Sequence, residues 1–165
     1  MQNAVKEAQR AVTKAAPGSG TTLTAVLVIG QQMTIAHVGD SRAYSVQPNG
    51  QMTLLTRDHS LVRRLEELGQ ITSDEAAVHP QRNVLYRALG QGEFLEADVF
   101  TAPFPTPGYL FLCSDGLWGV VSDEEMSRKI SEAINIQTAC QNLVAAANSA
   151  GGPDNISSVL VKLLS

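Results

Sequence analysis

The stretch HVGDSRAY, residues 37–44, places an aspartate between two segments with strand character. Residues 32–38 precede the Gly-Asp pair and residues 42–47 follow it, and both segments contain residue types that favour β-strands. A Gly-Asp pair between two such segments is typical of a hairpin turn, because both residues tolerate the backbone angles that tight turns need. Taken alone, Gly39 and Asp40 are therefore expected to form a turn.

Two further aspartates occupy similar positions. Asp115 follows the apolar run YLFLC (residues 109–113), and Asp154 lies in GGPDN (residues 151–155), just before the last apolar run. Each also has a local interpretation as a turn residue. Together with Asp40, they are three acids at the ends of separate strands, which can converge at one edge of a sheet. Clustered carboxylates repel one another, and a hard divalent cation such as Mg²⁺ or Mn²⁺ relieves that repulsion.

Length and composition bound the class of protein. The chain has 165 residues, of which 44% are hydrophobic, which is typical of one globular domain with a sizeable core. Its formal net charge of −4 argues against a nucleic-acid partner, which usually needs a basic surface. No apolar run is long enough to span a membrane, and the N-terminus lacks the apolar core of a secretion signal. A cytoplasmic protein, or a cytoplasmic piece of a larger one, is expected.

Cysteines and histidines give weaker information. Cys113 and Cys140 lie in apolar segments and are expected to be reduced core residues, which favours a reducing compartment. No Cys/His spacing indicates a zinc site. His37 lies in an apolar strand and is expected in the core, and no catalytic role is assigned to it, to His59 or to His79.

Hydrophobic periodicity predicts strands and helices that are largely segregated along the chain. This order favours an α+β fold, with antiparallel sheets and helices packed outside them, over a doubly wound parallel fold. The three strands over residues 32–56 are expected to form an antiparallel meander. The predicted elements are a helix over 3–16, strands over 21–29, 32–38, 42–47 and 51–56, a helix from Ser60 to Gly69, a turn-rich excursion over 69–92, strands over 95–100 and 109–113, helices over 123–134 and 137–149, and a strand over 155–163.

Six stretches of the chain, taken in order, resemble the motifs of one protein family. The sequence is similar to the PPM family of metal-dependent serine/threonine protein phosphatases, the type 2C phosphatases, and to its bacterial members in particular. Each motif alone is weak evidence, whereas six in the family's order are specific. The motifs are GSGTTLTAVLV (18–28), HVGDSRAY (37–44), LLTRDHSLVRRLEELGQI (54–71), HPQRNVLYRALG (79–90), YLFLCSDGLWGVV (109–121) and GGPDNISSVLV (151–161).

The resemblance implies a fold and a set of site residues. The family fold is an αββα sandwich of two antiparallel β-sheets flanked by helices, expected here as a single domain over residues 1–165. The family's active site holds two Mn²⁺ or Mg²⁺ ions, sometimes with a third ion beside them. By position, the resemblance implies metal ligands at Asp115 and Asp154, an association of Asp40 with the third ion, and supporting roles for Asn155 and Gly116.

The resemblance also implies a reaction and its substrates. The reaction is hydrolysis of phosphoserine and phosphothreonine in proteins by a metal-activated water, without a covalent phosphoenzyme. The partners would be phosphorylated proteins, the products of serine/threonine kinases. Residues 57–90 match the family's flap, a segment beside the active site. Arg63, Arg64 and Arg82 are candidates to contact a phosphopeptide there, and solvated surface arginines are the alternative interpretation of each.

The sequence departs from the family at its N-terminal side. The family's acidic strand motif with its phosphate-binding arginine is absent, and so is the D-G-x-G-G-H motif with its metal-bridging aspartate. The chain is therefore expected to begin inside the domain. Three hypotheses remain open: a fragment of an active phosphatase that is inactive alone, a non-catalytic module that binds phosphoproteins or partners through a degenerate phosphatase fold, and a chain completed by another polypeptide that supplies the missing strands.

Overall fold

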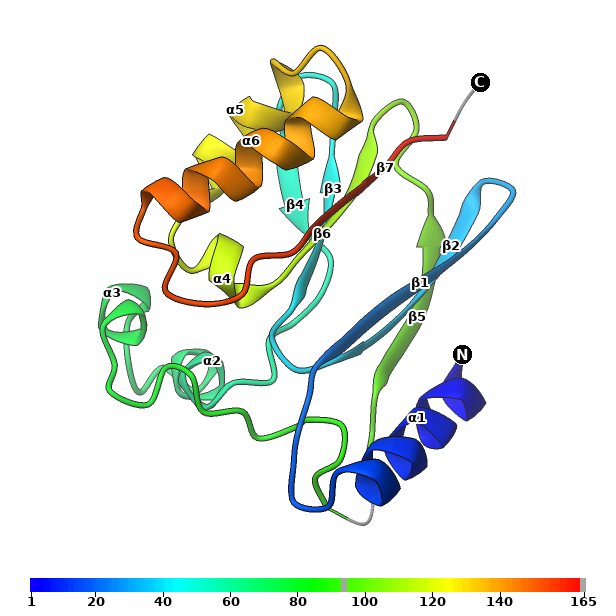
Figure 1. Ribbon diagram of the computed structural model, residues 1–165, viewed down its shortest axis with the longest axis vertical. Helices are drawn as coiled ribbons and strands as arrows, with labels where there is room; N and C mark the ends of the chain where they lie inside the picture. Colours follow the sequence, from blue (N-terminus) through cyan, green and yellow to red (C-terminus); the bar gives the residue numbers. More distant parts are fainter. Residues whose placement is uncertain (93–94, 164–165) are drawn as a thin grey trace. The chain divides into compact units, whose positions relative to one another are not determined.

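The computed structural model describes residues 1–92 and 95–163, and the chain divides into two compact units (Figure 1). The fold is α+β, with two antiparallel sheets and associated helices, as the segregated order of predicted elements indicated. The first unit comprises residues 1–28, 33–40 and 57–102, and the second comprises residues 29–32, 41–56 and 103–165. Each unit is described by itself.

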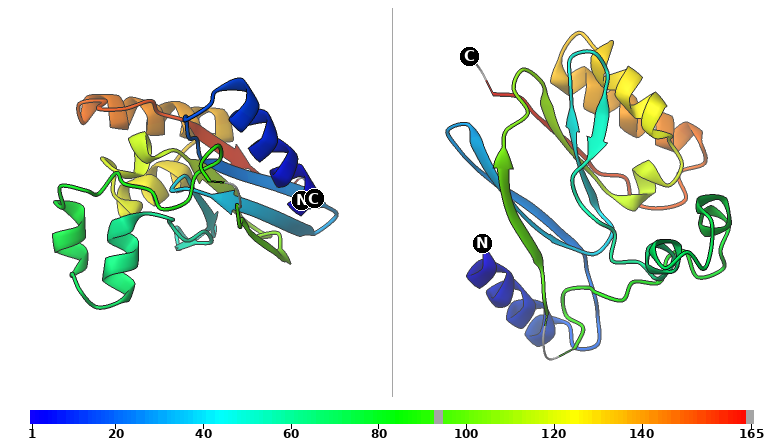
Figure 2. Two further views of the ribbon diagram at one scale, coloured as in Figure 1. Left: turned by 90° about the horizontal axis from the view of Figure 1, so that it is seen from below. Right: turned by 180° about the vertical axis from the view of Figure 1, so that it is seen from behind.

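The sheet of the first unit has three strands in the order β1-β2-β5. The strands are β1 (Leu23–Ile29), β2 (Gln32–Val38) and β5 (Asp98–Pro103). One end residue of each strand, namely Ile29, Gln32 and Pro103, belongs to the second unit. Helix α1 (Gln2–Ala15) lies along this sheet, as Figure 2 shows. Its apolar stripe joins a core cluster with strand β2, because residues three or four apart share one helix face. The buried members of the cluster are Val5, Ala36, Val38 and Leu89.

Two short helices follow in the first unit. Helix α2 (Leu61–Glu67) begins at the predicted cap, where the Ser60 hydroxyl accepts a hydrogen bond from the Arg63 amide at 3.3 Å. Helix α3 (Ser73–Ala77) lies inside the segment that the sequence indicated as a turn-rich excursion. A capping box between Thr72 and Glu75 starts it, a signal that the sequence analysis overlooked.

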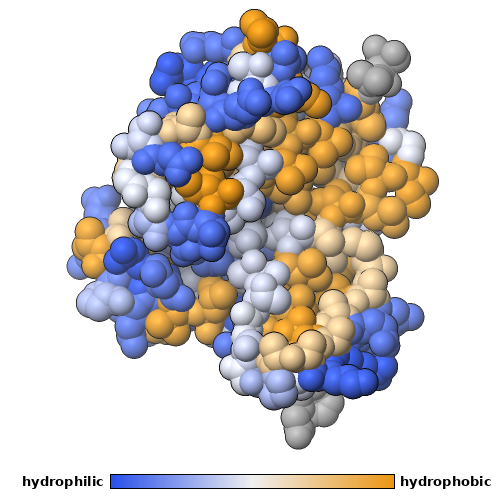
Figure 3. Space-filling view, viewed as in Figure 1, coloured by the Kyte–Doolittle hydropathy of each residue, from blue (hydrophilic) through white to orange (hydrophobic). Residues whose placement is uncertain are grey.

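The sheet of the second unit has four strands in the order β4-β3-β6-β7, all antiparallel. Helices α5 (Asp123–Ser131) and α6 (Ile136–Ser149) lie beside it, near their predicted positions. Figure 3 shows hydrophilic side chains over the outer face of these helices, with a small apolar tip at the loop between them. The strands are β3 (Arg42–Val46), β4 (Met52–Leu54), β6 (Tyr109–Cys113) and β7 (Ser158–Val161).

The core of the second unit comes from alternate positions of its strands. In register, Tyr44 pairs with Phe111 and Phe111 pairs with Leu160, so these three side chains line one face of the sheet. Leu143 and Ala147 of α6 belong to the same buried cluster. Cys113 and Cys140 are free thiols, as the sequence predicted.

The predicted three-strand meander is wrong. Strand β2 belongs to the sheet of the first unit, whereas β3 and β4 belong to the sheet of the second. Gly39 and Asp40 therefore lie where the chain leaves one sheet and enters another, and they are not a hairpin turn. Gly39 has φ +103°, and a Cβ there would lie 2.4 Å from Cγ2 of Thr22, so glycine is required for both conformation and space.

Three other predictions need smaller corrections. The strand expected over 95–100 is β5, which begins at Asp98. The strand expected over 51–56 is reduced to β4, over Met52–Leu54. Asp115, expected in a turn, is the first residue of a short helix, α4 (Asp115–Trp118). Within the described residues, no helix is both long and apolar enough to cross a membrane.

Candidate active site

Asp115 is held at the start of helix α4, directly after strand β6. Its Oδ1 accepts a hydrogen bond from the Gly116 amide at 2.9 Å, and the residue is half-buried. Gly116 is buried against the segment before β7, where an added Cβ would lie 2.4 Å from the Asn155 carbonyl oxygen. Glycine thus lets α4 begin in direct contact with the backbone that carries Asp154.

Asp154 lies in the exposed turn before strand β7. Its Oδ1 accepts a hydrogen bond from the Asn155 amide at 2.7 Å. The Ser114 hydroxyl donates to the Asn155 carbonyl at 3.0 Å and accepts from the Ser157 amide at 2.9 Å, so one side chain ties the two aspartate-bearing segments together. Since β6 and β7 are antiparallel neighbours, the end of one and the start of the other lie at the same edge of the sheet.

Asp40 belongs to a different unit of the chain from Asp115 and Asp154. It is the last residue of the first unit's 33–40 segment and is 8% exposed, whereas Asp115 and Asp154 belong to the second unit. Over residues 1–92 and 95–163, no group of three or more His, Cys, Asp or Glu side chains is arranged to hold a metal ion. Within the second unit, the structure brings together the segments that carry Asp115 and Asp154.

The donor chemistry of this pair fits the expected ions. Carboxylate oxygens are the ligands that Mg²⁺ and Mn²⁺ prefer. Asp115 and Asp154 each have one oxygen held by a backbone amide, which helps to orient the carboxylate. The pair is a partial ligand set, because two carboxylates alone do not fill the coordination of either ion.

A polar network that the sequence analysis missed supports helix α4. The guanidinium carbon of Arg42, from the GDSR motif, lies 3.6 Å from the centre of the Trp118 ring, which is a cation–π contact. Arg42 also donates to the buried Tyr44 hydroxyl at 3.2 Å, and that hydroxyl donates to Asp123 at 3.4 Å. Burial raises the pKa of Tyr44 above its usual range, so this hydroxyl stays protonated. The network links β3 to both ends of the α4–α5 connection.

Residues 57–90, which are expected to match the family's flap and are called here the flap segment, are closed at their base by backbone pairing within the first unit. Ser60 and Leu85 form an isolated antiparallel bridge, and the Tyr86 amide donates to the His59 carbonyl at 2.9 Å. The segment between these contacts carries α2 and α3.

The three arginines predicted to meet substrate differ in their surroundings. Arg63 is paired with Glu66 at 2.8 Å and with Glu67 at 3.4 Å. Arg64 lies 3.8 Å from Glu67, too far for a hydrogen bond, and lines a pocket. Arg82 is exposed on the chain between α3 and the end of the flap segment.

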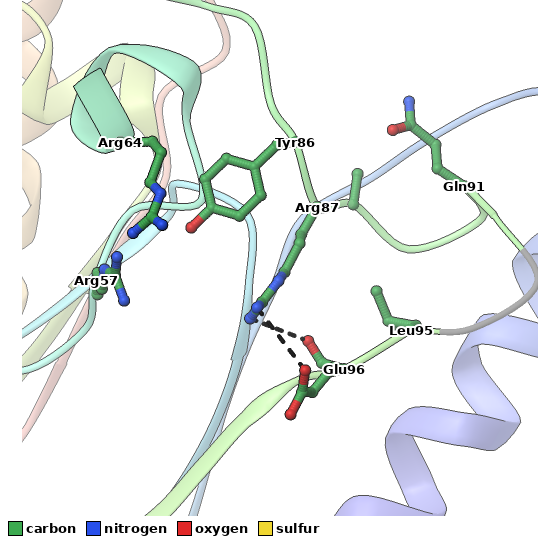
Figure 4. A pocket seen from close by; sticks show the side chains of 8 residues that line it. Arg57, Arg64, Tyr86, Arg87, Gln91, Leu95 and Glu96 are labelled. Carbon is green, nitrogen blue, oxygen red and sulfur yellow. Dashed lines mark hydrogen bonds and ion pairs between the residues drawn. The ribbon is translucent and has the colours of Figure 1, made fainter. Parts of the chain in front are cut away.

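The pocket beside Arg64 has a volume of about 550 Å³ and lies within the first unit. Figure 4 shows the guanidinium groups of Arg57 and Arg64 near each other beside the Tyr86 ring, and the guanidinium of Arg87 directed toward Glu96, which lies 3.9 Å away. Apart from Arg64, the lining residues were not predicted, because they come from separate segments. The pocket is lined by Arg57, Arg64, Tyr86, Arg87, Ala88, Gln91, Leu95 and Glu96.

Two buried histidines join the flap base to strand β2. The Gly39 amide donates to Nδ1 of His59 at 3.1 Å, so the proton of neutral His59 sits on Nε2, which lies 3.2 Å from Asp98. Nε2 of His37 lies 3.0 Å from the Arg57 carbonyl, a contact that requires the proton there. Burial lowers the pKa of both rings. His37 is in the core, as predicted.

Comparison with known proteins decides the family. The model of the family described as "Protein phosphatase 2C" matches residues 1–156. This chain belongs to the protein phosphatase 2C family. The family consists of metal-dependent serine/threonine protein phosphatases, as the six motifs indicated.

Curated bacterial relatives of the chain are phosphatases by name. It is 43% identical over 145 residues to a serine/threonine phosphatase, stp, of Listeria innocua, a match that covers 88% of this chain and 57% of the relative. It is 38% identical over 146 residues to the protein phosphatase PhpP of Streptococcus pneumoniae, covering 88% of this chain and 59% of that protein. The chain therefore spans less than two thirds of these relatives.

Solved structures show the same fold. The phosphatase Stp1 of Staphylococcus aureus superposes with a TM-score of 0.91 at 33% identity, covering 99% of this chain and 66% of that one. The PstP/Ppp phosphatase of Mycobacterium tuberculosis gives 0.85 at 36% identity, covering 94% and 66%. A structure of the PstP catalytic domain, with a TM-score of 0.80 at 33% identity and coverage of 93% and 64%, is a complex with two manganese ions.

Proposed function

We propose that this chain forms most of a catalytic domain that hydrolyses phosphoserine and phosphothreonine in proteins. The observation that carries the proposal is the juxtaposition of Asp115 and Asp154, whose segments are tied by Ser114 and packed through Gly116. The two segments thus place two carboxylates at one edge of the sheet, and carboxylate oxygens are ligands for a hard divalent cation. Phosphoprotein substrates and a cytoplasmic location belong to the proposal, and the free thiols support a reducing compartment.

Each site residue has a distinct part in this proposal. Asp115 and Asp154 would hold Mn²⁺ or Mg²⁺, and an ion bound there supplies an activated water and stabilises charge on the phosphoryl group. The Gly116 and Asn155 amides fix the two carboxylates. Asp40 is proposed as a ligand of a further ion.

The three flap arginines are proposed to contact the phosphoprotein outside the reacting phosphate. Arg64 is the best placed of them, since its head group lines a pocket and is bound only loosely by Glu67. Arg63 is already engaged by Glu66 and Glu67, which limits its freedom to meet a substrate. Arg82 is exposed and available to a partner surface.

A second candidate function is a non-catalytic module that binds phosphoproteins. The specific observation in its favour is that the described residues contain no group of three or more metal-ligating side chains. Two carboxylates bind a hard divalent ion weakly, and hydrolysis by a metal-activated water needs a well-held ion.

Manganese binding and hydrolysis, measured on the same samples, separate these functions. The parent chain and Asp115→Asn are titrated with Mn²⁺ by electron paramagnetic resonance and assayed on p-nitrophenyl phosphate. We expect weak Mn²⁺ binding by the parent chain and at least a tenfold loss in Asp115→Asn, because a charged oxygen ligand is removed. Asp74→Asn, in the first turn of α3, is the matched control with the same change of charge.

The outcomes are distinct. Hydrolysis that requires Mn²⁺ and disappears in Asp115→Asn would establish catalysis by this chain. Mn²⁺ binding without hydrolysis would agree with an incomplete catalytic domain. If the parent chain and Asp115→Asn bound Mn²⁺ equally, the metal role of Asp115 would be disproved and the binding module would become the better account.

A further inference from the structure

We propose that the pocket formed by Arg57, Arg64 and Arg87 beside Tyr86, called here the arginine pocket, binds a phosphoryl dianion. None of its residues is a candidate metal ligand. The inference that the pocket binds phosphate follows from its geometry alone. The identification of its natural ligand as a phosphoprotein rests on the proposed function.

The pocket gathers positive charge from three separate segments of the first unit. Arg57 follows strand β4, Arg64 lies in α2, and Arg87 lies beyond the Ser60–Leu85 bridge at the flap base. Three guanidinium groups line the cavity with one carboxylate, that of Glu96, which is 87% exposed and lies 3.9 Å from Arg87 as a long ion pair. The lining therefore carries an excess of positive charge, in a chain whose formal net charge is −4.

Carboxylates outside the pocket hold these arginines in position. Glu67 accepts a hydrogen bond from Nε of Arg57 at 2.6 Å and a second one from a terminal nitrogen of the same guanidinium. The Glu67 carboxylate also lies 3.8 Å from Arg64. Asp98 accepts a hydrogen bond from Arg87 at 3.3 Å. Neither acid lines the pocket. They order two long side chains in advance, which lowers the entropy that binding must overcome.

The arginines keep donors for a ligand. A guanidinium has five N–H donors, and the bidentate pair with Glu67 uses two of those on Arg57. Arg64 lies 3.8 Å from Glu67, an ion pair too long for a hydrogen bond. The paired N–H groups of a guanidinium match the spacing of phosphate oxygens. Several guanidinium groups stabilise a doubly charged phosphoryl group more than a singly charged carboxylate.

The rest of the lining suits the carbon atoms next to a phosphoryl group. Tyr86 presents its ring at 42% exposure, with the Arg87 guanidinium carbon 5.6 Å from the ring centre. Ala88 and Leu95 add an apolar wall, and Gln91 adds an amide. A phosphorylated side chain would place its phosphate among the arginines and its carbon atoms along this wall, whereas inorganic phosphate would use the arginines alone.

Arginine side-chain NMR spectra of the full 165-residue chain test the inference. The Nε–Hε signals are followed during titration with inorganic phosphate, in a buffer that contains EDTA and is held at constant ionic strength with chloride. Saturable shifts of the Arg57, Arg64 and Arg87 signals are expected, with Arg10 unaffected. Absence of saturable shifts, or equal shifts with chloride alone, would overturn the inference.

Variants assign the binding to the pocket. Arg64→Gln is expected to weaken phosphate binding about tenfold, because one hydrogen bond between the guanidinium and the phosphate is lost. The fold should be little affected, since the ion pair of Arg64 with Glu67 is long. Arg87→Gln provides a second position on another segment. Arg10→Gln, an exposed arginine of α1 that is paired with Glu7, is the matched control and should bind phosphate like the parent chain. Unchanged affinity in both Arg64→Gln and Arg87→Gln would disprove the site.

A phosphoserine peptide and its unphosphorylated counterpart identify the source of the phosphoryl group. Additional shifts at Tyr86 and Leu95 with the phosphopeptide alone would support a phosphoprotein ligand. Shifts confined to the arginines, equal for peptide and inorganic phosphate, would support free phosphate as the ligand. Because EDTA removes metal, hydrolysis plays no part in these measurements, so failure of the proposed catalysis and failure of the arginine pocket would be observed separately.

Discussion

At the residue scale, the positions of Asp115 and Asp154 next to strands were predictable, and the arginine pocket was not. Asp115 and Asp154 follow or precede apolar runs with turn residues around them, a pattern that is visible in a few neighbouring residues. Arg57 and Arg87 meet only because the chain returns to the flap base after 30 residues, as the Ser60–Leu85 bridge shows. No local pattern carries that information. The requirement for Gly116 likewise follows from a backbone contact with Asn155 and not from the Asp-Gly pair itself.

The contact at Gly116 gives a prediction for a single added methyl group. Gly116→Ala should lower the free energy of unfolding by about 1–3 kcal/mol, because the Cβ would meet a backbone oxygen that cannot rotate away. Urea unfolding followed by Trp118 fluorescence measures the loss. Amide NMR signals of residues 155–157 should also shift. Gly18→Ala introduces backbone strain at φ +80° but has nothing near the added Cβ, so it should leave those signals in place even where it lowers stability. Unperturbed signals in Gly116→Ala would show that α4 does not rest on this backbone.

At the element scale, the type of most elements was predicted and their partners were not. Helix α2 begins at Ser60 as expected, because a cap is a local signal. The predicted pairing of the strands in a meander was wrong, because the sequence pattern of a strand shows which of its side chains are apolar but not which other strand it pairs with. Strand β3 pairs with β6, so that Tyr44 finds its partner in Phe111, 67 positions later in the sequence.

The contact between β2 and the flap base predicts a dependence of stability on pH. His37 and His59 are 0% and 1% exposed, and burial lowers the pKa of each below 6.5, the usual value for histidine. The unfolded chain therefore binds more protons below pH 6.5, and the stability from the neutral rings is lost as the pH falls through that value. The slope approaches about 1.4 kcal/mol per pH unit for each histidine.

Urea unfolding of the parent chain between pH 7.5 and 5 measures this slope. His37→Gln and His59→Gln should each reduce it, since each variant removes one group that is neutral when buried. His79→Gln replaces the remaining histidine, outside this cluster, and is the control. A slope that stayed the same in both His37→Gln and His59→Gln would show that the pair does not set the acid sensitivity, and the carboxylates that pair with arginines would then be the cause.

At the scale of the whole molecule, the composition and the order of motifs led to the correct family and fold class. The six motifs are specific for the family when taken together. The α+β class follows from strands and helices that occur in separate parts of the sequence. The division into two units was not predicted, because it depends on which segments pack together over long distances. The chain spans 57% of its Listeria relative and 66% of the Staphylococcus structure.

A fusion addresses completeness directly. A segment that carries the family's D-G-x-G-G-H and arginine motifs, neither of which occurs in the 165 residues, is joined to residue 1. We expect Mn²⁺-dependent hydrolysis of a phosphothreonine peptide at least a hundredfold above that of the 165-residue chain, because a bridging carboxylate and a phosphate clamp would complete the ligand set. The same fusion with Asp154→Asn should lose this gain, which excludes catalysis by the added segment alone. A folded fusion that binds Mn²⁺ but stays inactive would mean that Asp115 and Asp154 are held in a geometry unsuited to hydrolysis, and the phosphoprotein-binding module would then explain the retained flap and its arginine pocket.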